Sequence, residues 1–351
     1  MIRGERALFL ASLALSGFLR LFFPRPPRYP RRILIVRLDE LGDMVTTLPV
    51  FARLKAAFPQ TEITLWCTPA VAPLLEAVQQ IDNRCTSRAQ LNGRYDVLVD
   101  LRGSYASLVY GLLHPAFRVD RGTRRVMNRW LRRPQPHEVH INQIIIGPLL
   151  RRANCHVEPF HAPRLSVGPR NRENAELFLQ RNAIGRFVVF HTGARWVYRR
   201  WGISKWAELA VVMHQRFECE VVFAGGGDDV ADIQKVMRLL PFGAYHCAGQ
   251  FSLLDYAALV ARAVCMIGNE SGPMHIAAAM DVPVVGLFGP GIPSVFAPYG
   301  PKSRFIHHKL PCNPCAQTQC LLPDNPCMNR IGVQDVLRVV QGIEGVAGEL
   351  E

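Results

Sequence analysis

The feature that most restricts the fold is a repeated alternation of short apolar runs with amphipathic stretches. In the first half of the chain, "RRILIVRL" (31–38) has the composition of a buried strand, and residues 39–59 predict a loop followed by a helix. "EITLWC" (62–67) predicts the next strand, residues 71–78 a helix, and "YDVLVDL" (95–101) a third strand. Strands that alternate with helices are typical of a parallel, doubly wound α/β sheet.

The same alternation returns in the second half of the chain. Apolar runs that lead into small or glycine-rich turns predict strands in "RFVVFHTGA", "CEVVFAGGGDD", "VCMIGNE" and "VPVVGLFG", with helices between them. We therefore predict two Rossmann-like units, over residues 31–168 and 169–335, and a C-terminal helix over 336–351. Ligands of such sheets bind outside the carboxyl ends of the strands, so we expect the site in a cleft between the two units.

The N-terminal residues need a separate interpretation. "ALFLASLALSGFLRLFF" (7–23) is mostly apolar but contains Arg20, and arginines precede and follow it. A spanning helix needs about 20 apolar residues, and a signal peptide needs a small-residue cleavage site with few positive charges after it. The basic flanks favour a segment (1–30) that lies on the anionic cytoplasmic face of the inner membrane. A core-packed helix and a true span are the alternatives.

The overall charge implies an anionic partner. Lys and Arg number 41 and Asp and Glu 28, which gives a net charge of +13. Nucleic acid, an acidic membrane face and phosphorylated ligands are all compatible with this charge. Six of the ten cysteines are isolated in mostly apolar surroundings, which favours a reducing cytoplasm.

The stretch "GNESGPMHIAAAMDVPVVGLFGP" (268–290) predicts a phosphate site at the start of a helix. Ser271 is placed as the N-cap, and Pro273 suits the first turn because its missing N–H is not needed there. The free amides of residues 272–275 can bind an anion, and Gly272 lets a ligand approach the backbone. An ordinary capped helix is the alternative.

Two further strand ends carry residues suited to a nucleotide. In "FHTGARWVYRRWG", the turn Thr192-Gly193-Ala194 precedes Arg199 and Arg200, and amides with guanidinium groups suit a diphosphate. A solvated basic loop is the alternative. Asp229, just past a glycine turn, can accept from ribose hydroxyls, although the dinucleotide pattern GxGxxG is missing there.

Asp43 follows Gly42 after the first predicted strand. A carboxylate at this position can act as a general base if it reaches an acceptor hydroxyl. The alternative is that Asp43 only caps the next helix.

Together these segments resemble glycosyltransferase family 9, the lipopolysaccharide heptosyltransferases, in order and spacing over residues 31–335. The resemblance implies a GT-B fold of two Rossmann-like domains facing a cleft. It also implies an ADP-heptose-like donor, a lipopolysaccharide core acceptor, and an inverting transfer without a metal or other cofactor. The acceptor domain is then 31–168 and the donor domain 169–335.

The resemblance also implies roles for individual residues. The catalytic base falls on Asp43, the phosphate-contacting Lys falls near Arg199 with Arg200 as its neighbour, and the ribose-binding acid falls on Asp229. The adenine-lining segment and the diphosphate-binding helix start fall on Gln250, Phe251, Ser271, Gly272, Met274 and His275.

The chain departs from the family pattern at two places. Glu270 stands where the family usually has Asp, and one methylene is enough to shift a hydroxyl contact to the sugar. The Lys-to-Arg change near Arg199 keeps the charge and adds a bidentate fork.

The predicted acceptor-binding residues are basic. "DRGTRRVMNRWLRR" (120–133) places arginines, Arg121 and Arg125 among them, at helical spacing on one face. Arg102 and His137 are further candidates to reach carboxylates and phosphates of an acceptor. A solvated basic helix is the alternative.

Four cysteines, Cys312, Cys315, Cys320 and Cys327, have a spacing that suits zinc. The resemblance does not imply a metal at this Cys-rich segment, and we favour reduced thiols that pack a loop.

Two other functions stay open at this point. A nucleotide-sugar epimerase or hydrolase on the same fold would not need an arginine-rich acceptor domain. A basic nucleic-acid binder would need several aromatic residues interleaved with the basic stripe, and residues 120–133 contain a single one, Trp130. We therefore expect no nucleic-acid partner and a cytoplasmic enzyme peripheral to the inner membrane.

Overall fold

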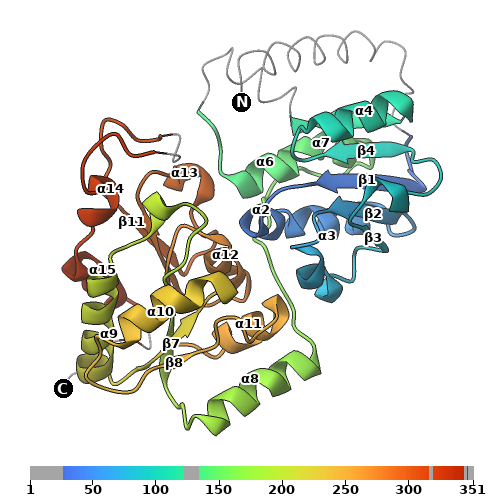
Figure 1. The fold of residues 1–351 in the computed structure, drawn as a ribbon. Helices are drawn as coiled ribbons and strands as arrows, with labels where there is room; N and C mark the ends of the chain where they lie inside the picture. The colour runs from blue at the N-terminus through green and yellow to red at the C-terminus, as the bar shows by residue number, and fades with distance from the viewer. Residues whose placement is uncertain (1–26, 115, 122–133, 316–318, 344–345, 347–351) are drawn as a thin grey trace. The chain divides into compact units, whose positions relative to one another are not determined.

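The computed structural model describes residues 27–114, 116–121, 134–315, 319–343 and 346. The chain forms two compact units, Met1–His161 (unit 1) and Ala162–Glu351 (unit 2), and each contains one parallel sheet (Figure 1). The predicted α/β class with two parallel sheets is confirmed. The apolar segment 7–23 lies outside the described residues, and none of the helices described is long and apolar enough to cross a membrane.

Unit 1 contains a five-stranded sheet in the order β3-β2-β1-β4-β5. Its strands are β1 (Arg32–Arg37), β2 (Glu62–Cys67), β3 (Asn83–Cys85), β4 (Val97–Asp100) and β5 (Phe117–Asp120). Ile33 pairs with Ile63 on one side and with Val97 on the other. The run 95–101 is therefore the fourth strand, not the third, because the short β3 has no apolar run of its own.

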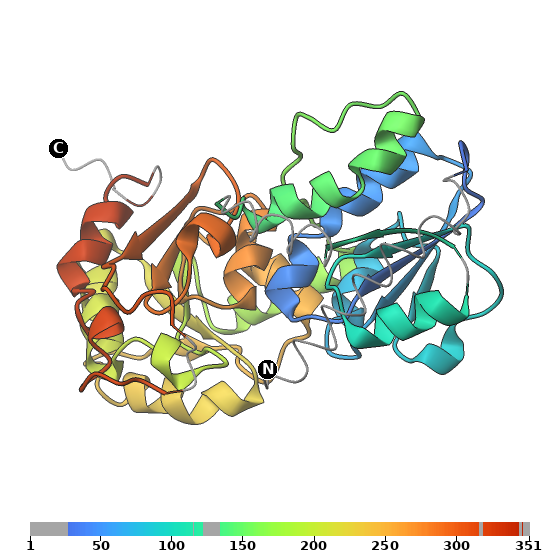
Figure 2. The same cartoon turned by 90° about the horizontal axis from the view of Figure 1, so that it is seen from above.

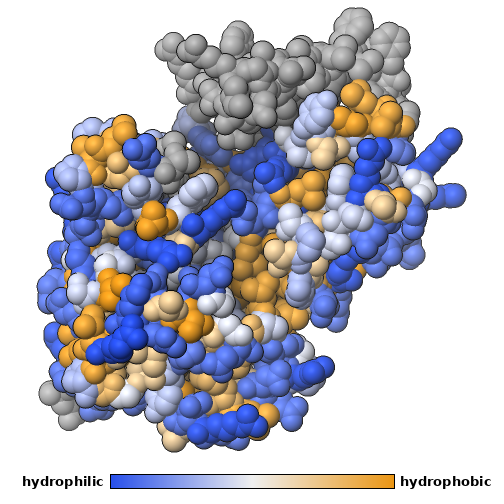
Figure 3. All heavy atoms as spheres, in the orientation of Figure 1, coloured by the Kyte–Doolittle hydropathy of each residue, from blue (hydrophilic) through white to orange (hydrophobic). Residues whose placement is uncertain are grey.

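Alternate residues of β1 face opposite sides of the sheet, as the pleat requires. Leu34 and Val36 pack with Leu98 and Tyr110 under α4 (Tyr105–Leu113). The other face is covered by α3 (Leu48–Ala57), α6 (Glu138–Ile145) and α7 (Gly147–Arg152), and Figure 2 shows this division on either side of the strands. The outer side of α4 stays apolar and exposed, and an orange patch marks it in Figure 3.

Residues 39–59, predicted as a loop followed by one helix, form two helices, α2 (Leu41–Val45) and α3. Pro49 sits in the first turn of α3 and has no N–H to continue the hydrogen-bond ladder from α2. Thr46 and Thr47 fill the break, and their hydroxyls donate to the Asp43 carbonyl at 2.8 and 2.9 Å. The predicted helix over 71–78 is a 3-10 helix, η1 (Ala72–Ala77), while η2 (Arg88–Gln90) is a single turn.

Unit 2 contains a six-stranded sheet in the order β11-β10-β9-β6-β7-β8. The strands are β6 (Phe187–His191), β7 (Glu220–Ala224), β8 (Tyr245–His246), β9 (Met266–Asn269), β10 (Val284–Phe288) and β11 (Ser303–His307). In both units the first strand lies between the second and the fourth, so the winding reverses beside it. Ligands bind at such switch points in doubly wound sheets.

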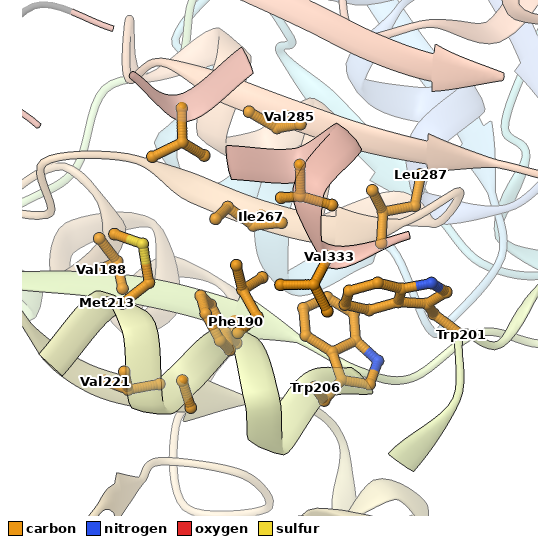
Figure 4. Close-up of a cluster of buried hydrophobic side chains, with 14 of the residues drawn as sticks. Val188, Phe190, Trp201, Trp206, Met213, Val221, Ile267, Val285, Leu287 and Val333 are labelled. Atoms are coloured by element: carbon orange, nitrogen blue, oxygen red, sulfur yellow. The ribbon is translucent and has the colours of Figure 1, made fainter. Parts of the chain in front are cut away.

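One face of the unit 2 sheet carries a large apolar core, shown in Figure 4. Val188 and Phe190 of β6 meet Trp206 and Met213 of α9 (Ile203–Phe217) there. The same core includes residues of α10 (Val230–Met237), α14 (Pro326–Asn329) and α15 (Val333–Val340), the last lying in the region of the predicted C-terminal helix. The remaining helical elements are α8 (Pro169–Arg181), η3 (Val197–Arg199), η4 (Gly227–Asp229), α11 (Leu253–Val260), α12 (Gly272–Ala279) and α13 (Pro293–Phe296).

Candidate functional site

Unit 1 gathers six charged side chains beyond the ends of its central strands. We call this set the carboxylate cluster; it comprises Asp39, Asp43 and Glu138 with Arg37, Arg102 and Arg121. The residues come from the end of β1 and the loop after it, from α2, from the loop after β4, from the position just after β5 and from the start of α6. The cluster therefore lies at the switch point of the unit 1 sheet.

Arg37 is the centre of this cluster. Its side chain is fully buried, and Nη1 donates to the Leu101 carbonyl at 2.6 Å. Nη2 donates to Glu138 Oε1 at 2.8 Å and to Asp43 Oδ1 at 3.2 Å, while Nε lies 3.3 Å from Asp39 Oδ2. Burial alone would lower the pKa of Arg37, but the three carboxylates outweigh it and leave that pKa raised.

Asp43 lies inside α2 and not at its N-cap, which is Glu40. Its side chain remains 28% exposed, so a substrate hydroxyl can reach it. Burial raises the pKa of Asp43, and the neighbouring Asp39 and Glu138 raise it further, against the opposing effect of Arg37 and Arg121. A carboxylate with a raised pKa is a stronger base than an ordinary aspartate.

The predicted acceptor residues have different positions. Arg102 lies 3.2 Å from Asp39 Oδ1 and is 47% exposed. Arg121 is mostly buried and donates from Nη2 to Glu138 Oε2 at 2.7 Å. His137 is the N-cap of α6, and its Nδ1 accepts from the Val139 amide at 3.2 Å. Arg125 and the rest of the basic stripe after residue 121 lie outside the described residues.

Unit 2 carries the second group of predicted residues at the ends of β6, β7 and β9. We call it the anion cradle; it comprises Thr192–Ala194, Arg199, Arg200, Asp229 and Glu270–His275. Asn269, which the sequence did not single out, ties the parts together. It is fully buried, donates to the Thr192 carbonyl at 2.7 Å and accepts from the Trp201 amide at 3.1 Å.

Asp229 lies directly against Gly193. A Cβ at Gly193 would be 2.3 Å from the Asp229 carboxylate, so a larger residue there would displace that carboxylate. Asp229 accepts from the Gly226 amide at 3.0 Å and lies 3.8 Å from Arg200. Arg200 also bonds to Asp232 at 2.7 Å and to the Ala194 carbonyl at 3.0 Å, so its guanidinium is largely committed to the protein.

Glu270 is almost completely buried, at 3% exposure. Its Oε1 lies 3.3 Å from Arg199, while Oε2 has no hydrogen-bond partner among the described residues. Gly291 approaches so closely that a Cβ there would meet Oε2 at 1.9 Å. Burial raises the pKa of Glu270 to about 7, against the opposing effect of Arg199.

The start of α12 differs in one respect from the prediction. Ser271 occupies the N-cap position, but its hydroxyl donates to the Asn269 carbonyl at 2.9 Å and does not accept from a helix amide. The first amides of α12 are thus not used by the cap. Met274 is fully buried with its sulfur against Gly286, so only its backbone can face a ligand, and His275 is buried as well.

The predicted adenine segment borders a separate cavity. Gln250 and Phe251 line an open cavity of about 680 Å³ together with residues of α8, β8 and α11. Phe251 meets Phe178 edge to face, with ring centroids 5.3 Å apart. Glu270 and Arg199 do not line this cavity, so the predicted donor residues fall into two groups.

All ten cysteines are free thiols. Cys312, Cys315, Cys320 and Cys327 line one narrow cavity with Tyr198 and Asn325. Within the described part of the chain, no group of three or more His, Cys, Asp or Glu side chains has a geometry that could hold a metal ion. Burial raises the pKa of Cys67 to about 11 and of Cys247 to about 12, as expected for inert core thiols.

Comparison with known proteins matches the chain to one family. The model of glycosyltransferase family 9 (heptosyltransferase) matches residues 86–325. Lipopolysaccharide heptosyltransferase 1 of Pseudomonas aeruginosa is 26% identical over 324 residues, with 82% of this chain and 87% of the relative covered. The family 9 glycosyl transferase structure from Veillonella parvula has a TM-score of 0.73 and 18% identity, covering 89% of this chain and 97% of its own. The structure of E. coli ADP-heptose lps heptosyltransferase II has a TM-score of 0.69 and 21% identity, covering 89% and 98%.

Proposed function

The chain belongs to glycosyltransferase family 9, and on this premise we propose that it is an inverting enzyme that transfers a heptose, or a similar sugar, from an ADP-sugar to a lipopolysaccharide core acceptor. Family membership makes the chain a glycosyltransferase and favours transfer over an epimerase, a hydrolase or a nucleic-acid binder. The relatives support this donor and acceptor, since their names specify lipopolysaccharide and ADP-heptose.

The observation that carries the proposal is the environment of Asp43. Its carboxylate is held by Arg37 at 3.2 Å, is partly exposed, and has a raised pKa because of burial and two neighbouring carboxylates. A general base works best when its pKa lies near the operating pH and its position is fixed. These properties support Asp43 as the group that accepts the proton of the acceptor hydroxyl.

In the proposed reaction the acceptor oxygen forms a bond to C1 of the sugar while the bond from C1 to the diphosphate oxygen breaks. The hydroxyl proton passes to Asp43, and ADP leaves with the bonding electrons. By analogy with inverting hydrolases, the transition state resembles an oxocarbenium ion, and attack from the opposite face inverts C1.

The anion cradle would stabilise the leaving ADP. The first amides of α12 and the guanidinium of Arg199 offer fixed positive charge, so no metal is needed for this role. Asp229 would accept from the ribose, and Gln250 and Phe251 would line the adenine. The Thr192 hydroxyl is buried and has no partner in the described structure, so we propose that it also contacts the ADP-sugar.

The acceptor side of the proposal rests on unit 1. Arg102 is the best placed of the proposed acceptor residues because it is half-exposed and lies beside Asp39. Arg121, Arg125 and His137 complete the proposed set. The acceptor is membrane-bound, so we also propose that the enzyme works at the cytoplasmic face of the inner membrane, with residues 1–30 attached to it.

The test uses the purified full chain with ADP-heptose and a heptose-deficient lipopolysaccharide core. We expect ADP release only when acceptor is present, an inverted linkage by NMR, and unchanged turnover in EDTA. ADP should raise the melting temperature, and oligonucleotides should leave it unchanged. ADP release without acceptor would instead indicate a hydrolase, and loss of turnover in EDTA would contradict a metal-independent reaction.

A further inference from the structure

Arg37 is an unusual residue for the strand in which it lies. The other buried positions of β1 are apolar, and Arg37 is fully buried at the strand's carboxyl end. A buried charge is tolerated only when it is paired and hydrogen-bonded. Its bond to the Leu101 carbonyl fixes the guanidinium, so the direction in which Nη2 points is fixed too.

Glu138 supplies the main counter-charge. It is fully buried at the first position of α6, where a helix N-terminus favours a negative charge. Burial would raise the pKa of Glu138, but Arg37 and Arg121 more than reverse this and hold it below its ordinary value. Glu138 is therefore ionised at neutral pH.

Nη2 of Arg37 is shared between two carboxylates. The distance to Glu138 Oε1 is 2.8 Å and the distance to Asp43 Oδ1 is 3.2 Å, so Glu138 holds the shorter bond. Asp43 thus receives an orienting hydrogen bond from Arg37, while Glu138 already balances most of the positive charge of Arg37. The charged groups that act on Asp43 are Arg37, Asp39, Glu138 and Arg121.

We infer that Arg37 and Glu138 form a positioning pair for the general base: Arg37 orients the Asp43 carboxylate, and Glu138 neutralises Arg37 so that Asp43 stays basic. Neither residue needs to touch the substrate. The inference rests on the proposed role of Asp43 as the base.

The test compares Glu138→Gln with wild type in the pH dependence of kcat/KM. Without the Glu138 charge, Arg37 acts more strongly on Asp43, so the acidic limb should move to lower pH by roughly one unit. A weaker base should also lower the plateau rate about three- to tenfold, while KM for the ADP-sugar stays unchanged. Glu138→Asp should restore part of the plateau rate.

Two further variants keep the test decisive. Arg121→Gln removes a cation that acts on Asp43. The acidic limb of the kcat/KM profile of this variant should therefore move to higher pH, opposite to that of Glu138→Gln. Glu62→Gln breaks the 3.0 Å pair with Arg32 at the other end of β1 and should move neither limb nor plateau. If Glu138→Gln does not fold, Arg121→Gln decides alone.

A lower rate with an unmoved acidic limb in both variants would mean that the cluster is merely structural and would overturn the inference. The proposed function fails separately. If Asp43→Asn keeps near-wild-type transfer, Asp43 is not the base. If Asp43→Asn is inactive and the limbs stay fixed, only the positioning pair is wrong.

Discussion

The sheets of the two units have the same strand order around their first strand, but the side chains at the switch point differ. In unit 1 the space beside β1 holds three arginines and three carboxylates that balance one another. In unit 2 the space beside β6 holds glycine turns and a helix start. It also holds two buried polar atoms, Thr192 Oγ1 and Glu270 Oε2, that have no hydrogen-bond partner among the residues the structure describes. The charges of the carboxylate cluster already balance one another before any substrate arrives, whereas the anion cradle offers unbalanced hydrogen-bonding groups to a ligand.

This difference follows from what each group has to do. A base must be held in one position and must be ionised before the acceptor hydroxyl arrives, and ion pairs favour both. A diphosphate brings its own charge, so its site needs donors and space and can leave them unsatisfied until the ligand binds. Changes in unit 1 should therefore affect turnover, and changes in unit 2 should affect ADP binding and stability.

Asp43→Asn should have the largest effect. Turnover should fall by roughly 10²–10⁴-fold, the usual contribution of a general base. ADP affinity by calorimetry should stay at the wild-type value, because the anion cradle lies in the other unit. A matched loss of ADP affinity would break the division of roles between the units.

Glu270→Gln should change stability with pH. The pKa of Glu270 is about 7 in the native state against an ordinary value of 4.5, so the native state holds a proton that the unfolded chain lacks between these values. Stability is then lost as pH rises from 4.5 to 7. At pH 8 the variant should be more stable than wild type by at most roughly 3 kcal/mol, and near pH 4 the two should agree.

Denaturant titration followed by tryptophan fluorescence measures this difference. Glu176→Gln is the control, because Glu176 is 42% exposed in its pair with Arg262. A Glu270→Gln variant that is less stable at pH 8 would show that the ionised pair with Arg199 holds the loop.

The sequence predicts the parts of both sites that are local. Apolar runs mark the central strands, and the residues just after them, such as Asp43, Gly193 and Ser271, lie at the strand ends as expected. Pro49 signals the break between α2 and α3, although the apolar pattern alone predicts one helix there.

What the sequence could not predict is contact between distant residues. Arg37 and Glu138 are 101 positions apart, and Glu138 has no local feature that marks it. For Arg37 the sequence offers one signal, which is a charged residue at the end of the apolar run of β1. The burial of Glu270 also depends on Gly291, which only the folded turn brings against it.

Arg199→Ala should weaken ADP binding by about 1.5–3 kcal/mol, the contribution of a charge-assisted hydrogen bond. Arg200→Ala should cost less, because that guanidinium already bonds to Asp232 and Ala194. Arg216→Ala is the control, since Arg216 stacks on Phe217 at the end of α9. Calorimetry that finds equal losses for Arg199 and Arg200 would contradict this order.

Gly193→Ala should have the smallest effect on ADP affinity, and Gly227→Ala is a closely matched control. The new Cβ would lie 2.3 Å from Asp229 Oδ1, so the carboxylate must move away from the position proposed for the ribose contact. We expect ADP affinity to fall by about 1 kcal/mol, one hydrogen bond, while the affinity for inorganic diphosphate is kept. Gly227→Ala introduces a methyl group in the neighbouring turn with no atom within 4 Å and should change neither affinity. If Gly193→Ala weakens diphosphate as much as ADP, the turn itself binds phosphate and Asp229 does not contact the ribose.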